Sequence, residues 1–229
     1  MYDDFKVIDW RVNEMKKTSR QQQKEQTREL LLKTAYERFA EQGIMKTRMS
    51  DIAHAAEVSH GTVFAHFQTQ EALVEEVVEN CCYRIAMRTH ALADNCENIE
   101  ALLKAHLNGI MEYEKFYTRL IVENQMLPSG ARDSWIGVQS AMSFHFSQVC
   151  DRDKELRAIT EHGADKSGGA AAADTDTNGR IPAHMLFNLW MGLVHYYLEN
   201  GDLFAPEGNV LRRYQDTLID SYIKLLKRK

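Results

Sequence analysis

Two imidazoles, two hydroxyls and a bare glycine lie within nine residues, in the run SHGTVFAHF at residues 59–67. Imidazole nitrogens bind metal ions, and imidazole and hydroxyl groups also reach DNA bases and phosphates. His60 and His66 are six positions apart, which places them about 240° apart around a helix. Because they cannot share a metal ion in that arrangement, the run favours a surface that contacts a partner.

The apolar pattern around this run is typical of a helix-turn-helix. It consists of Ile52, Ala53, Ala56, Val58 and Val63. The pattern predicts a short helix of about eight residues that starts at Thr47 or Arg48. Before it, apolar residues at helical spacing predict a first helix over 27–39, and Gly43 follows where a left-handed cap belongs.

Ser59 is a natural N-cap for a third short helix over 60–67. Its hydroxyl can accept a hydrogen bond from the amide of Thr62, three residues on. The small side chain of Ala53 lets this helix approach the one before it. His60, Gly61 and Thr62 are then left at a free amino-terminal edge, a geometry that fits the major groove of DNA.

The whole chain reads as all-α. It has 229 residues, of which 44% are hydrophobic, and only 3 prolines, and it lacks the alternation of apolar and polar residues that marks strands. No apolar run reaches the roughly 20 residues that a membrane span needs, so we expect a soluble, cytoplasmic protein. The four cysteines lack CxxC spacing and are expected to be reduced.

The charge is unevenly distributed. The formal net charge is −5, but residues 16–70 carry nine Lys or Arg against six Asp or Glu. Residues 71–229 carry 17 against 23. This asymmetry indicates a basic head that meets a polyanion and an acidic body that does not.

Beyond the head, five longer amphipathic segments predict a helical body, over 71–94, 98–126, 131–160, 182–200 and 208–227. The run at 163–179 is low in large apolar residues and reads as a surface loop. We therefore expect a basic arm over 1–22, a DNA-binding domain over 23–70 and a helical body over 71–229.

The run from Thr27 to Leu73 resembles the amino-terminal domain of TetR-family repressors. The matching pieces are Ala35 and Phe39 with Gly43, Ile52-Ala53, Val58-Ser59, Gly61-Thr62, His66-Phe67, and Glu71 with Leu73. The resemblance implies a homodimer that binds a pseudo-palindromic double-stranded DNA operator and a small hydrophobic or amphipathic inducer. It also implies DNA contacts from Lys46, Thr47, Arg48, Ser59, His60, Gly61, Thr62, Phe64, His66 and Gln70.

Four residues depart from the family pattern. Phe64 replaces a tyrosine whose hydroxyl binds phosphate, and Gln70 replaces a lysine. Glu57 replaces a turn glycine, and a positive φ there would cost on the order of 1 kcal/mol. Arg48 replaces a Ser or Thr cap, so Thr47 is the alternative cap. These departures suggest weaker DNA binding, or a dependence on the arm at Lys16, Lys17 and Arg20.

The body offers residues for an inducer site and for dimerisation. The ligand-binding candidates are Met111, Phe116, Tyr117, Trp135, Phe144, His145, Trp190 and His195, of which most would simply be core. The segments at 182–200 and 208–227 resemble the family's dimerising pair. An alternative is a helical ligand-binding or interaction protein whose head no longer reads DNA.

Other motifs are weak. Residues 174–181 match the first eight positions of an EF-hand loop, but position twelve is Met185 instead of Glu. No nucleophile elbow, P-loop or dinucleotide-binding glycine pattern occurs. The sequence therefore predicts neither an enzyme nor a cofactor or metal requirement.

Overall fold

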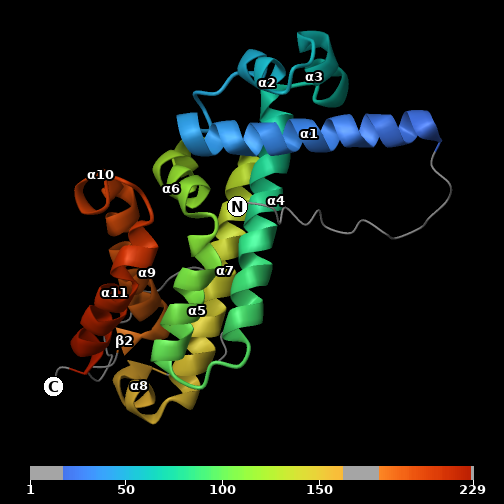
Figure 1. The fold of residues 1–229 in the computed structure, drawn as a ribbon. Coiled ribbons are helices and arrows are strands. Elements are labelled where there is room, and N and C mark those ends of the chain that lie inside the picture. Colours follow the sequence, from blue (N-terminus) through green and yellow to red (C-terminus); the bar gives the residue numbers. More distant parts are fainter. Residues whose placement is uncertain (1–17, 162–180, 228–229) are drawn as a thin grey trace.

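Helices make up nearly all of the computed structural model, which describes residues 18–161 and 181–227 (Figure 1). The head contains α1 (Ser19–Gln42), α2 (Met49–Ala55) and α3 (His60–His66). The body contains α4 (Gln70–Ala93), α5 (Ile99–Met111), α6 (Glu114–Glu123), η1 (Asn124–Met126), α7 (Ser129–Arg152), α8 (Lys154–Ile159), α9 (Ala183–Glu199), α10 (Gly201–Phe204) and α11 (Val210–Leu226). The two-residue strands β1 (Thr160–Glu161) and β2 (Ile181–Pro182) pair in parallel. The predicted all-α class is confirmed.

Helix α1 extends beyond the predicted range at both ends. Thr18 caps it by accepting from the Gln21 amide at 3.4 Å, and the Gln21 side chain accepts from the Thr18 amide at 2.9 Å. Good helix formers follow at 19–26, where the apolar spacing that led to the prediction is missing. The helix ends at Gly43 as expected, but with φ of +104° and ψ of 148° this glycine does not adopt the expected left-handed cap. The boundary expected at residue 22 lies inside this helix.

The head has its own apolar centre, formed where α1, α2, α3 and the start of α4 meet. Its fully buried members include Leu31, Phe39, Ile52, Val63 and Leu73. The apolar residues that predicted the helix-turn-helix therefore pack into the core of the head. The head sits at one end of α4, which runs on from α3 into the body (Figure 1).

In the body, α4 packs most closely against α7, and the two helices run in the same direction. The Gly130 amide donates to Glu75 near their first turns, and His90 meets His145 near their far ends. Cys81 and Cys82 are buried within the body. No helix in the described ranges is long and apolar enough to cross a membrane.

Two of the long predicted segments are each divided. The segment at 98–126 breaks at Tyr113 into α5 and α6, and the segment at 131–160 breaks at Asp153 into α7 and α8. Neither break contains Gly or Pro. The second is fixed locally, because the Asp153 carboxylate accepts from the Leu156 amide at 3.2 Å and so caps α8. The segments at 182–200 and 208–227 correspond to α9 and α11.

The predicted loop at 163–179, the EF-hand-like positions at 174–180 and the arm residues Lys16 and Lys17 lie outside the described residues.

Candidate nucleic-acid interface

Helix α3 presents its amino-terminal edge to solvent, as predicted. Ser59 caps it, because its Oγ accepts from the Thr62 amide at 3.1 Å and lies 2.8 Å from the Thr62 Oγ1. His60 and Gly61 are exposed, and a Cβ at Gly61 would meet only the Ser59 Oγ, at 3.8 Å. A partner can therefore approach the backbone at this edge closely.

The turn between α2 and α3 fixes the angle at which α3 is held. Glu57 has φ of +55°, the positive value that the sequence suggested, and the Val58 amide donates to the Ala53 carbonyl at 3.0 Å. Ala53 and Val63 are buried beneath this turn. The small residue at 53 therefore sits where the two helices meet.

The expectation that Thr47 caps α2 is wrong. Thr47 is fully buried, and its hydroxyl donates to the Gly43 carbonyl at 2.7 Å. The N-cap is Arg48, whose amide donates to the Asp51 carboxylate at 2.9 Å. The Thr47 hydroxyl is thus already bonded and cannot reach a phosphate, whereas Lys46 and Arg48 are exposed.

Gln70 contributes to the shape of the interface. Its Nε2 donates to the Thr47 carbonyl at 3.0 Å, which ties the first turn of α4 to the segment before α2. In this arrangement Gln70 supports the head instead of offering a charge to DNA.

Phe64 and His66 differ in their surroundings. Phe64 is 42% exposed, and its ring meets the His60 ring edge-on with centroids 4.9 Å apart. The His66 Nδ1 is buried and has no hydrogen-bond partner in the described part of the chain. Burial lowers the pKa of His66, and the nearby positive charges of Arg28 and Lys24 lower that pKa further.

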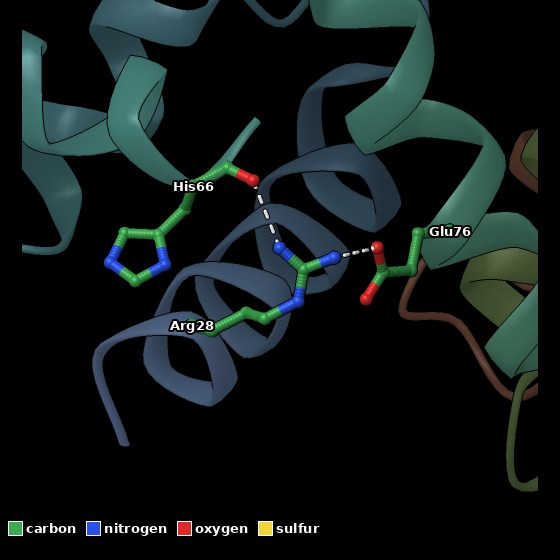
Figure 2. Close-up of polar contacts among 3 residues, drawn as sticks. All are labelled: Arg28, His66 and Glu76. Atoms are coloured by element: carbon green, nitrogen blue, oxygen red, sulfur yellow. Dashed lines mark hydrogen bonds and ion pairs between the residues drawn. The ribbon is translucent and has the colours of Figure 1, made fainter. Parts of the chain in front are cut away.

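Arg28 joins three elements of the head, and the sequence analysis missed it. Its Nη1 donates to the His66 carbonyl at 2.9 Å, and its Nη2 forms a short ion pair with Glu76 of α4 (Figure 2). The guanidinium carbon lies 4.4 Å from the centre of the Phe67 ring. Arg28 therefore fixes the carboxy-terminal end of α3 against α1 and α4. A signal did exist, since Arg28 lies three residues before buried Leu31 on the same side of α1.

A second joint, also missed, connects the head to α6. The buried Glu123 carboxylate accepts from the amides of Ile44 at 3.2 Å and Met45 at 2.8 Å. Arg119 donates to the carbonyls of Ala40 at 3.4 Å and Glu41 at 2.9 Å. The end of α1 and the following turn are therefore held by two charged side chains of α6.

Three of the ligand-binding candidates come together inside the body. The Tyr117 hydroxyl of α6 lies 3.3 Å from the His195 Nε2 of α9 and accepts from the Gln139 Nε2 of α7 at 2.9 Å. The Trp135 ring lies edge-on to Tyr117, with centroids 5.0 Å apart. Burial lowers the pKa of His195 to about 4, so this imidazole is neutral at pH 7.

The other five candidates are dispersed. Phe116 stacks on Tyr36, Trp190 packs against Tyr222, and His145 meets His90 at 3.0 Å. Met111 is half-buried at the end of α5. Phe144 is 61% exposed on α7, so its ring does not lie between helices of this chain.

Comparison with known proteins identifies the head. Residues 31–77 match the family described as bacterial regulatory proteins, tetR family. The protein named probable acrEF/envCD operon repressor, from Escherichia coli strain K12, is 41% identical over 51 residues. The match covers 22% of this chain and 23% of that protein, so the chain spans about a quarter of the length of this curated relative.

Solved structures resemble nearly the whole chain in fold. A transcriptional regulator from Saccharomonospora viridis in complex with choline has a TM-score of 0.63 at 14% identity, covering 90% of this chain and 97% of that one. The transcriptional regulator FadR from Bacillus subtilis in complex with stearoyl-CoA has a TM-score of 0.59 at 13% identity, covering 86% and 96%. At these identities the likeness establishes the fold alone.

Proposed function

We propose that this chain, whose residues 31–77 match the TetR family of bacterial regulatory proteins, is a sequence-specific DNA-binding transcriptional regulator. Its action is repression at a pseudo-palindromic operator, relieved by a small-molecule inducer. The observation that carries this proposal is the rigid presentation of α3. The Ser59 cap fixes one end of that helix and Arg28 fixes the other, while the polar edge between them is exposed.

In the proposed complex, the groups of α3 divide into base readers and backbone contacts. His60, Gly61 and Thr62 lie at the edge that enters the major groove. Lys46 and Arg48 are exposed before α2 and reach phosphates. The relative from Escherichia coli bears the name of a repressor, which supports repression over activation.

Dimerisation is proposed through α9 and α11. Met185, Leu189 and Tyr196 are 51%, 63% and 54% exposed on the outer side of α9, and Leu225 of α11 is 63% exposed. Exposed apolar side chains spaced along one helix face are typical of a surface that a partner covers. A second copy of the chain would bury them and place two heads on two half-sites.

The inducer site is proposed at Tyr117, Trp135, Gln139 and His195. These residues combine aromatic surface with neutral hydrogen-bonding groups, which suits an uncharged or amphipathic organic molecule. The complexes of two fold neighbours with choline and with stearoyl-CoA support a small organic ligand in such a body. An inducer acts only if it binds the DNA-free conformation more tightly than the DNA-bound one.

Helix α6 is the proposed route from this site to the head. Tyr117 lies on the same ten-residue helix as Arg119 and Glu123, which grip the end of α1 and the turn after it. A ligand that shifts Tyr117 therefore strains contacts with the head directly.

The proposal is tested with a mobility-shift assay on the DNA upstream of the protein's own coding sequence, against scrambled DNA of equal length. We expect a selective shift, and we expect His60→Ala to weaken it by roughly 5- to 150-fold, the 1–3 kcal/mol of one base contact. Lys104→Ala, on the exposed side of α5 in the body, is the control and should bind normally. Equal binding to both DNAs at low salt would instead favour a helical interaction protein that does not read DNA.

A further inference from the structure

The amino-terminal turns of α1 form a charged projection that the proposed function does not yet use. All residues from 19 to 26 are exposed, and the first buried residue of α1 is Leu31. In Figure 1 this end of α1 extends past α3 and α4, well clear of the body. The exposed stretch of eight residues is about 12 Å long. None of these residues is buried in the core of the head, so their side chains are accessible to a binding partner.

We propose that residues 19–28, which we name the α1 ledge, bind the DNA phosphate backbone beside the carboxy-terminal end of α3. This inference rests on the proposed function, because it adds a contact to the same DNA. It differs from the arm considered in the sequence analysis, because the contact comes from a continuous helix fixed to the head and includes Lys24.

The register of α1 gives the ledge its direction. Arg20, Lys24 and Arg28 are spaced at four-residue intervals, which keeps them within about 80° of one another around the helix. Buried Ala35 lies about 60° from Arg20 and about 20° from Lys24 around the helix. Since Ala35 faces the core of the head, Lys24, and Arg20 less directly, face the side on which α3 and α4 lie.

The charges of the ledge are available to a partner. Arg28 is already paired with Glu76. Within the described ranges, Arg20 and Lys24 have no ion pair. Gln21, Lys24, Glu25 and Arg28 border one open surface depression on α1. Glu25 is the one acidic residue of these four and opposes an anion there.

The ledge continues the expected DNA surface of α3. The Arg28 guanidinium bonds to the His66 carbonyl, so the ledge and the end of α3 are directly joined (Figure 2). His66 is one of the backbone contacts that the family resemblance implies, and the positive charge of Lys24 contributes to lowering its pKa. Two cations on the ledge would compensate for the hydroxyl missing at Phe64 and the charge missing at Gln70.

The test measures DNA affinity against salt concentration for the full chain and for the double variant Arg20→Gln/Lys24→Gln. Each phosphate neutralised adds about 0.9 to the slope of log K against log salt. We therefore expect the double variant to flatten the slope by roughly 1.8 per head, and to weaken operator and scrambled DNA by the same factor. Glu25→Gln should tighten binding to both.

Lys33→Gln is the matched control, since it removes a lysine from an exposed position further along α1 and should leave the slope unchanged. Circular dichroism shows whether each variant keeps its helices. A double variant with the slope of the original protein would overturn the ledge while leaving the regulator proposal intact. Selective binding by the original protein supports the regulator proposal independently, and a chain that binds no DNA at low salt would overturn both.

Discussion

Replacing Glu123 by Gln tests the joint between α6 and the head. Glu123 is 7% exposed, and its two carboxylate oxygens accept separate hydrogen bonds from the amides of Ile44 and Met45. Glutamine keeps one carbonyl oxygen and replaces the other oxygen with an NH2 group. Since NH2 only donates, one backbone amide next to it loses its acceptor.

The magnitude follows from these two bonds. A hydrogen bond to a charged group contributes about 1.5–3 kcal/mol, and a buried donor left without an acceptor costs about 1–3 kcal/mol. These figures overlap, because the unpaired amide is part of the lost bond. Removing a buried charge also relieves some desolvation. We therefore expect Glu123→Gln to lower the free energy of unfolding by about 2 kcal/mol, which for a chain of this size lowers Tm by roughly 4–8 °C.

Thermal unfolding followed by circular dichroism measures this loss, with Glu112→Gln as the control. Glu112 pairs with Arg88 at 3.1 Å, but both side chains are about half exposed, at 57% and 47%. An exposed pair contributes about 0–1 kcal/mol, so the control should melt within about 2–4 °C of the original protein. If the two variants melted at the same temperature, the buried joint would not stabilise the head and the reasoning would fail.

Four further predictions concern single sites. Phe64→Tyr should tighten DNA binding by roughly 2- to 10-fold per head without changing the salt slope, because a neutral hydroxyl releases no counterion; a steeper slope would contradict this. Glu57→Gly should raise the free energy of unfolding by about 1 kcal/mol by relieving the positive φ, and urea titration measures it. Gly109→Ala should lower the free energy of unfolding by about 1–3 kcal/mol, because the new Cβ would lie 2.2 Å from the Thr89 Oγ1 and 3.0 Å from the Thr89 Cα. An unchanged midpoint of urea unfolding would contradict this close contact. Burial lowers the pKa of His106 to about 3, below its value of about 6.5 in the unfolded chain. The contribution of neutral His106 to the free energy of unfolding is therefore complete above pH 6.5 and is lost as the pH falls toward 3. His106→Leu should therefore make the loss of stability between pH 6.5 and 4.5 shallower, as measured by urea titration at both pH values.

Features set by neighbouring residues could be predicted from the sequence. The Ser59 cap depends on an amide three positions away, and the positive φ of Glu57 on the turn that it occupies. The helical segments of the head followed from apolar spacing in the same way. Local rules sufficed at these places because the interacting groups are close in the chain.

Features set by distant residues could not be predicted. Arg28 is 48 positions from Glu76, and Glu123 is 78 positions from Met45. The break at Tyr113 also escaped prediction, because it contains no Gly or Pro to signal it. The exposure of Phe144 could not be predicted either, because the sequence does not show whether another element covers a hydrophobic residue on a helix.

At each end of helix α6, a carboxylate accepts hydrogen bonds from backbone amides of another segment. These two contacts bear on how a ligand could act. Glu114 accepts from the amides of Val210 at 2.7 Å and Leu211 at 3.0 Å, at the start of the proposed dimer helix α11. Glu123 holds the turn of the head at the other end. A ten-residue helix is about 15 Å long and stiff, so a displacement at Tyr117 cannot be absorbed within α6. It must strain the joint to the dimer helix, the joint to the head, or both. The coupling between ligand and DNA is then limited by the weaker joint, since a contact that yields freely transmits no difference in free energy between the two states.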